Sequence, residues 1–171
     1  MNKLSVLCAA GVIGAALTSG PAQAVPVSAT SNGKAIVLIP LKLTKVQDLD
    51  FGTAVTSAAA GSVVVDPSTG VATPSGGVTL VGATSTAAQF DFAGTANQQV
   101  TFSIASALPI SLSDGNGNNL SLSALTLSTT SAIVDPTTLT VQVGVGGQID
   151  VAANQPDGVY SNTFDVTADY N

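Results

Sequence analysis

The chain has 171 residues and carries four basic residues, ten acidic residues and no histidine, which gives a formal net charge of −6 at pH 7. Hydrophobic residues make up 45% of the chain and aromatic residues only 4%. The acidic balance disfavours nucleic acid and anionic membrane surfaces as partners, and the hydrophobic fraction is too high for a disordered chain.

The first 24 residues have the three parts of a secretory signal peptide. Met1-Asn2-Lys3 supplies the positive charge, residues 4–17 form an apolar run, and Ala22-Gln23-Ala24 has the small residues of a cleavage site. The apolar run is too short for a stable membrane span, so we expect export and cleavage after Ala24. Cys8 leaves with this segment, and the exported chain therefore cannot use a disulfide to hold its sheets together.

Cleavage would leave residues 25–171, with three lysines and ten aspartates, as a chain long enough for one domain with its own core. Residues 25–34 are small and polar, and we expect them to form a flexible N-terminal arm. A single β-sandwich domain is expected over residues 35–171. Its first segment, residues 35–44, alternates apolar residues on one parity and is a candidate donor strand, because Pro40 favours an edge or added strand over a central one.

The next apolar residues are Leu49 and Phe51, which alternate with Asp48 and Asp50. The period of two places the leucine and the phenylalanine on one face of a strand and the two aspartates on the other. We therefore expect Leu49 and Phe51 in the core and the aspartates in solvent.

Short apolar segments separated by glycine and proline turns occupy the middle of the chain. Strands are expected at residues 62–66, 78–81, 89–93, 100–104, 108–112 and 120–127. Phe90 and Phe92 share a parity, so one faces the core only if the other does, and a bulge is expected where the parity slips before Leu125. No segment has a sustained helical period, and strands at intervals of about ten residues indicate an all-β sandwich.

Two aspartate-proline pairs, Asp66-Pro67 and Asp135-Pro136, follow apolar segments and precede hydroxyl residues. Because the flanking sequences do not match, we interpret the similarity as shared turn chemistry rather than a duplicated domain. Asp114, Asn116 and Asn118 have the spacing of a calcium loop. The closing ligands are missing, however, and a plain hairpin turn is the better interpretation.

The last 31 residues, 141–171, show the clearest alternation. A turn is expected at residues 154–158, after which the chain reverses into a final strand. That strand has Asp165, Thr167 and Asp169 on one face, and we expect its neighbouring position in the sheet to be filled by something other than a later segment. The apolar residues of this region are Val141, Val143, Val145, Ile149, Val151, Phe164, Val166, Ala168 and Tyr170.

After residue 24 the chain has no histidine, cysteine, glutamate or arginine. A nucleophile-base triad, a thiolate or imidazole metal site and a guanidinium clamp are therefore unavailable. Paired aspartates could serve a glycosidase, but they lie on the solvent faces of expected strands. We expect no enzyme, no cofactor and no metal.

Two sequence blocks carry a resemblance to a known family. The first runs from Pro40-Leu-Lys-Leu-Thr-Lys45 to Leu49-Asp-Phe-Gly-Thr53, and the second from Val143-Gly-Val-Gly-Gly147 through Gln155-Pro-Asp-Gly-Val-Tyr160 to Tyr170. They resemble the DUF4402 family of secreted bacterial proteins and, more distantly, spore-coat-U-like and chaperone-usher pilin subunits. The chain differs from many pilins in lacking the cysteine pair of the first strands.

The resemblance implies an immunoglobulin-like antiparallel β-sandwich that is incomplete and accepts a donated strand. It implies a structural subunit of a bacterial surface fibre, exported through the periplasm to the cell surface, with a periplasmic chaperone, an outer-membrane usher and like subunits as partners. The candidate donor residues are Val37, Ile39, Leu41 and Leu43. The candidate groove or core residues are Leu49, Phe51, Phe164, Val166 and Tyr170.

Two questions stay open at the level of sequence. The arm could instead fold back into its own domain, which would make the protein a self-complemented monomer that acts as a surface or matrix binding module. The donor could also be the weaker upstream set at Val25 and Val27 rather than residues 35–44.

Overall fold

The computed structural model describes residues 25–82 and 84–171, and the expected signal peptide lies outside them. The chain divides into two units, one ending at Ala35 and one comprising Ile36–Asn171. Residues 25–35 of the first unit contain no strand and are exposed. The second unit is built from strands alone within the described residues, which confirms the all-β class.

The described residues of the second unit form twelve strands, of three to twelve residues each. In chain order they are β1 (Lys42–Gln47), β2 (Thr53–Val55), β3 (Gly61–Val65), β4 (Ala72–Gly76), β5 (Thr79–Val81), β6 (Ala88–Ala93), β7 (Gln99–Ile104), β8 (Ile110–Ser113), β9 (Asn119–Leu127), β10 (Ser131–Ile133), β11 (Thr140–Val151) and β12 (Val166–Tyr170).

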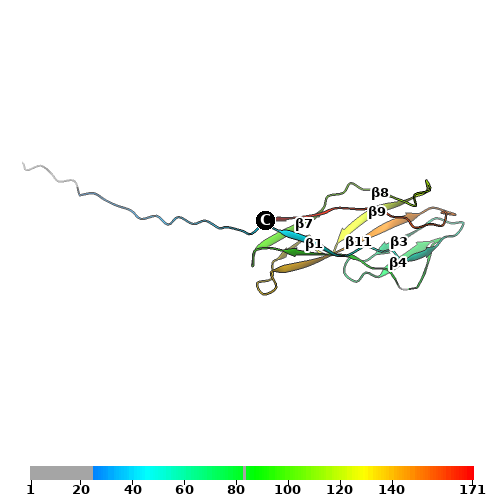
Figure 1. Ribbon diagram of the computed structural model, residues 1–171, viewed down its shortest axis with the longest axis horizontal. Coiled ribbons are helices and arrows are strands. Elements are labelled where there is room, and N and C mark those ends of the chain that lie inside the picture. The colour runs from blue at the N-terminus through cyan, green and yellow to red at the C-terminus, as the bar shows by residue number, and fades with distance from the viewer. Residues whose placement is uncertain (1–24, 83) are drawn as a thin grey trace, which may run out of the picture. The chain divides into compact units, whose positions relative to one another are not determined.

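These strands form an antiparallel β-sandwich (Figure 1). A seven-stranded sheet has the order β1-β6-β11-β3-β4, with β9 also paired to β11 and β8 paired to β9. A three-stranded sheet has the order β10-β7-β12, and β2 pairs with β5 separately. The long strand β11 is the centre of the larger sheet, because β6 pairs with its first half while β3 and β9 pair with its second half.

The two larger sheets enclose one apolar cluster, here called core cluster 1. Phe92 of β6 is fully buried and its ring centroid lies 4.5 Å from that of Phe102 in β7, across the sandwich. Phe90 is also buried, as the shared parity predicted. The buried members of core cluster 1 are Ala88, Phe90, Phe92, Val100, Phe102, Val134, Val143, Val145 and Val166.

A second apolar cluster, core cluster 2, lies under the other half of β11. Its buried residues come from β3, β8, β9 and β11 and from Val78, just before β5. They are Val63, Val78, Leu112, Leu120, Leu122, Ile149 and Val151. The apolar alternation of β11 therefore supplies both clusters, Val143 and Val145 to the first and Ile149 and Val151 to the second.

Close packing explains why two positions of β11 are glycine. The chain leaves β3 across β11, and a Cβ atom on Gly144 would collide with the carbonyl oxygen of Pro67, while one on Gly146 would collide with that of Val65. Only glycine leaves room for such a close approach of backbone to backbone.

The two aspartate-proline turns share their chemistry, as predicted. One carboxylate oxygen of Asp66 accepts from the backbone N–H groups of Ser68 and Thr69, and Asp135 accepts from those of Thr137 and Thr138 in the same way. These bonds hold the pKa of both carboxyls below the usual value. The largest contribution comes from the backbone N–H of Thr69 for Asp66 and from that of Thr138 for Asp135.

The predicted bulge lies in β9, where the register against β11 shifts between Ala124 and Leu122 and leaves Ser123 unpaired. The hairpin tip expected at residues 114–118 joins β8 to β9. Three short strands, β2, β4 and β10, have no counterpart among the predicted ones. Each has at most five residues and little buried apolar surface, so it leaves little period-two signal.

The first strand differs from its prediction. A strand over residues 35–44 was expected, but β1 begins at Lys42 and extends to Gln47, with a register irregularity before its end. Residues 36–41 do not pair as a strand, because Pro40 has no N–H and the backbone groups of Ile39 are bonded to side chains instead. The last strand, β12, pairs with β7 of the smaller sheet and not with β11.

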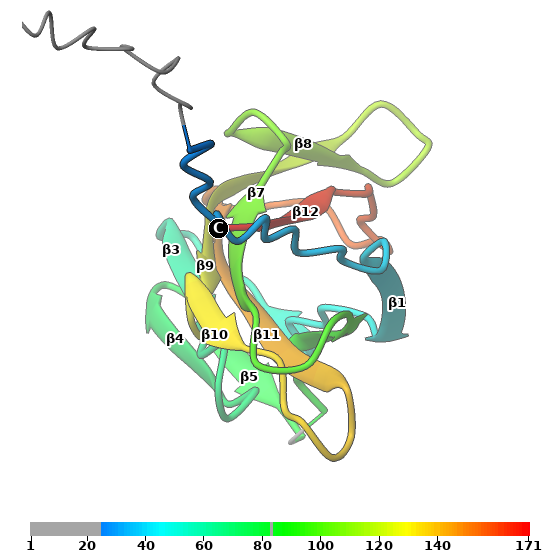
Figure 2. The same cartoon turned by 90° about the vertical axis from the view of Figure 1, so that its left-hand side faces the viewer.

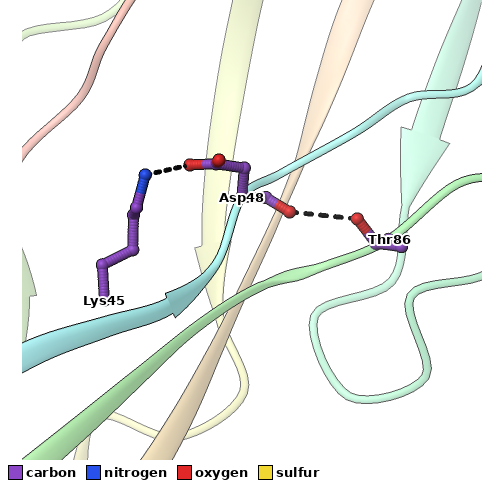
Figure 3. Close-up of polar contacts among 3 residues, drawn as sticks. All are labelled: Lys45, Asp48 and Thr86. Carbon is purple, nitrogen blue, oxygen red and sulfur yellow. Dashed lines mark hydrogen bonds and ion pairs between the residues drawn. The ribbon is translucent and has the colours of Figure 1, made fainter.

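The end of β1 is fixed by polar contacts (Figure 3). Lys45 Nζ lies 2.6 Å from Asp48 Oδ1, and the Thr86 hydroxyl donates to the carbonyl oxygen of Asp48 at 3.0 Å. Asp50 and Thr86 exchange two backbone hydrogen bonds of 2.9 Å. Both aspartates are exposed, as the alternation predicted.

Candidate strand-accepting site

The last strand, β12, is an edge strand. Within the described part of the chain its ladder partner is β7 alone. Asn171 N donates to Gln99 O at 3.0 Å and Ala105 N donates to Asp165 O at 2.9 Å, so the odd-numbered residues of this strand direct their backbone groups toward β7. In an antiparallel ladder the intervening residues point the other way. The N–H and C=O groups of Val166, Ala168 and Tyr170 therefore line an open edge.

A second strand with an unpaired edge is β1, which ends the larger sheet and pairs with β6. Its six residues are all exposed, including Leu43 at 42%. No ladder joins β1 to β12 among the described residues. An edge strand of this kind presents unpaired backbone donors and acceptors to any segment that can add to it.

Apolar side chains on and beside these two strands are only partly covered. Phe164 packs its ring edge-on against Phe90, with the centroids 6.3 Å apart, and remains half-buried. The partly buried residues that pack against core cluster 1 from the segments flanking β1 and from the β12 region are Leu41, Leu49, Phe164, Ala168 and Tyr170. Core cluster 1 is therefore less completely covered here than at its centre.

A group of hydrogen bonds, here called the Tyr170 clasp, joins three segments close to the C-terminus. Tyr170 Oη donates to Ile39 O at 2.8 Å and accepts from Thr95 N at 2.7 Å, and Ile39 N donates to Thr95 Oγ1 at 2.9 Å. Figure 2 shows the segment before β1 passing the C-terminus of β12. A Cβ atom on Gly94 would lie 2.7 Å from Tyr170 Oη and 2.8 Å from Leu41 Cδ2, so this turn must carry glycine to admit the tyrosine.

The structure brings together five of the nine candidate residues. Leu41, Leu49, Phe164, Val166 and Tyr170 all contact core cluster 1. Leu49 is half-buried, so its parity was predicted correctly but its complete burial was not.

The remaining four candidates lie elsewhere. Phe51 is half-buried and packs against core cluster 2. Val37, Ile39 and Leu43 are exposed, at 89%, 55% and 42%. Sequence reasoning missed Gly94 and Thr95, because Thr95 bonds to residues 56 and 75 positions away, which no local pattern reveals. Ala168 was identified as an alternating apolar residue but not as a candidate site residue.

The turn at Asp114 uses its carboxylate within the hairpin. Asn118 Nδ2 donates to Asp114 Oδ2 at 2.7 Å, and the N–H groups of Asn116 and Asn118 donate to Oδ1 at 2.8 and 3.0 Å. The side-chain bond from Asn118 is the largest contribution that lowers the pKa of Asp114. Residues 25–82 and 84–171 contain no group of three or more metal-ligating side chains of the His, Cys, Asp and Glu types. They also contain no helix with the length and apolar character needed to cross a membrane.

The chain matches the model of a known protein family. A family model described as "Domain of unknown function (DUF4402)" matches residues 41–170, which is more than half of the chain. The match begins just before β1 and covers every strand. No curated protein and no solved structure matches the chain.

Proposed function

This chain belongs to the DUF4402 family, and we propose that it is a structural subunit of a bacterial surface fibre whose copies join by donor-strand exchange. The observation that supports the proposal is the open edge of β12, where backbone groups of Val166, Ala168 and Tyr170 have no ladder partner. Addition of an extended segment to such an edge gains main-chain hydrogen bonds, and its alternate side chains find apolar contacts.

Partly buried apolar side chains that flank the two edge strands, β1 and β12, fit this role. Leu41, Leu49 and Phe164 are half-covered and lie against core cluster 1. An added strand with apolar residues at every second position would bury them further, as the missing strand of an immunoglobulin-like sandwich would. Each fully buried aliphatic or aromatic side chain contributes about 1.5–3 kcal/mol relative to its exposed state.

The same chain carries a segment suited to be the donor. Val25, Val27, Val37 and Ile39 share one parity and are between 55% and 96% exposed. Leu41 and Leu43, in contrast, belong to the domain itself, one half-buried against core cluster 1 and one in β1. The donated part of the candidate strand is therefore the part that precedes Leu41.

Head-to-tail donation extends without closing, which makes a filament. Before assembly an exposed edge is an aggregation hazard. For this reason the proposal includes export through the periplasm, with a chaperone that covers the edge and an outer-membrane usher that releases the subunit. The protein performs no catalysis in this role.

The Tyr170 clasp favours a second candidate function. It ties Ile39 to the end of β12 within one chain, as expected of a self-complemented monomer that serves as a surface or matrix binding module. In that case the segment before β1 would close its own domain.

Electron microscopy and gel electrophoresis of native material distinguish the two candidates. We expect fibres, and a ladder of subunits that resists mild detergent. A heat-labile monomer at all protein concentrations would contradict the fibre and support the self-complemented module.

A further inference from the structure

The charges of this chain are strongly separated along its sequence. Residues 25–171 contain three lysines, Lys34, Lys42 and Lys45, and ten aspartates, all of which lie from residue 48 onward. The segment before residue 48 is therefore basic and the rest of the chain acidic. Two copies of this protein repel each other through their bodies and attract each other through the basic segment of one and the body of the other.

Two of the aspartates, Asp169 within β12 and Asp165 directly before it, lie beside the open edge. Asp165 and Asp169 are exposed and alternate with Val166 and Ala168, so their side chains project from the outer face of the strand. Among the described residues the one ion pair joins Lys45 to Asp48. Within the described part of the chain, no lysine therefore forms an ion pair with Asp165 or Asp169.

The lysine in the exposed segment has the parity that matches these aspartates. If Val37 and Ile39 face the apolar side of a sandwich, the period of two places Lys34 on the opposite face. At β12 and the residue directly before it, the same face carries Asp169 and Asp165. An added strand would therefore place its lysine on the same outer face as the two aspartates, and opposite charges on neighbouring strands stabilise the pairing where they lie opposite each other.

From this geometry we infer that the open edge of β12 is a docking surface for residues 25–39 of a second copy of this chain, with Lys34 placed against the Asp165 and Asp169 face. The inference rests on the proposed function and adds how the edge recognises its donor. Apolar residues on the inner face of the donor segment supply the contact area. Lys34 sets the register of this segment against β12 and favours the acidic edge of β12 over other strand edges. Charge attraction also raises the association rate and makes it sensitive to salt.

Peptide binding tests the inference directly. A fluorescent peptide copying residues 25–39 is titrated with the full chain, and anisotropy gives the dissociation constant at about 0.01 M and about 1 M salt, where the Debye length falls from about 30 to about 3 Å. We expect the peptide with Lys34→Glu to bind about fivefold more weakly at low salt and equally at high salt.

Variants of the chain supply the matched comparison. Asp169→Lys should weaken binding of the native peptide and strengthen binding of the Lys34→Glu peptide. Asp150→Lys makes the same change of net charge but lies in β11 of the other sheet. It should neither weaken binding of the native peptide nor strengthen binding of the Lys34→Glu peptide. Equal effects of Asp169→Lys and Asp150→Lys would show a general charge effect and overturn the docking surface.

Full-length chains give a second readout. Lys34→Glu and Asp169→Lys chains should each assemble slowly alone and recover when mixed, because each supplies the partner that the other lacks. Fibres that form at the wild-type rate from both variants, or failure of the peptide to bind while fibres form, would overturn this inference and leave the proposed function intact. Absence of fibres from the wild-type chain would overturn the proposed function itself.

Discussion

The hydroxyl group of Tyr170 donates a 2.8 Å hydrogen bond to the carbonyl oxygen of Ile39, which lies 131 positions earlier in the chain. The same hydroxyl accepts from Thr95 N at 2.7 Å. The strand with the open edge and the segment with the exposed apolar residues therefore meet at one side chain. Donor-strand exchange that moves residues 36–41 must break this contact. Tyr170 therefore links the proposed donor segment to the proposed acceptor strand within one subunit.

Replacement of Tyr170 by phenylalanine tests the clasp. The ring would still pack, but Ile39 O and Thr95 N would lose their partner, and we expect a loss of about 1–3 kcal/mol in the free energy of unfolding. Urea unfolding measures this loss, and hydrogen exchange should show the Thr95 amide less protected. Unchanged exchange at Thr95 would contradict the assignment of this bond.

Gly94→Ala should disturb the same contact sterically. The new methyl group would lie 2.7 Å from Tyr170 Oη and 2.8 Å from Leu41 Cδ2, so one of them must move. We expect a loss of about 1–3 kcal/mol, typical of an overpacked site. Gly33→Ala is the control, because a Cβ atom there has no neighbour within 4 Å. Equal unfolding midpoints for the two variants would mean that the tyrosine packs elsewhere.

The alternation of residues predicted faces well. It placed Asp48 and Asp50 in solvent, put Phe90 and Phe92 on one shared face and identified the outer face of β12. These properties depend on backbone geometry over a few residues. The shared turn at Asp66 and Asp135 was predictable for the same reason, since the hydrogen bonds to its carboxylate span at most three residues.

Pairing between distant segments was not predictable in this way. Residues 36–41 alternate like a strand, yet Ile39 is held by Thr95 and Tyr170, which no local pattern reveals. Leu49 and Phe51 have the right parity but are only half-buried, because burial depends on whether another segment covers them.

Two phenylalanines of different burial provide a graded stability test. Phe92 is fully buried in core cluster 1, so Phe92→Ala should reduce the free energy of unfolding by about 3–5 kcal/mol. Phe51 is half-buried against core cluster 2, so Phe51→Ala should cost about half as much. Chemical denaturation measures both values. A Phe51 loss as large as that of Phe92 would show that Phe51 is fully covered in solution.

Acid should destabilise the fold through three turn aspartates. Hydrogen bonds within their turns hold the pKa of Asp66, Asp114 and Asp135 below the ordinary aspartate value in the folded state. A lowered carboxyl pKa contributes stability above the unfolded value, and this stability is lost as the pH falls through the folded pKa. Urea midpoints should therefore decrease below about pH 4. Replacement of all three by asparagine should flatten this decrease, and an unchanged slope would contradict the hydrogen-bonded turns.

The last prediction tests the donor segment with a charge placed on one of its two faces. Ile39 is 55% exposed in its own domain, so Ile39→Lys should fold, but its ammonium group could not enter an apolar site of a second copy without a large desolvation cost. We expect folded subunits that form no fibres in electron micrographs and that bind an added peptide copying residues 25–44. Ile36→Lys is the matched control, because Ile36 is 66% exposed and has the opposite parity, so this variant should assemble. Fibres of normal length from Ile39→Lys would exclude the part of the segment around Ile39 as the donor. If, in addition, a chain that lacks only residues 25–33 formed no fibres, the donor role would belong to Val25 and Val27.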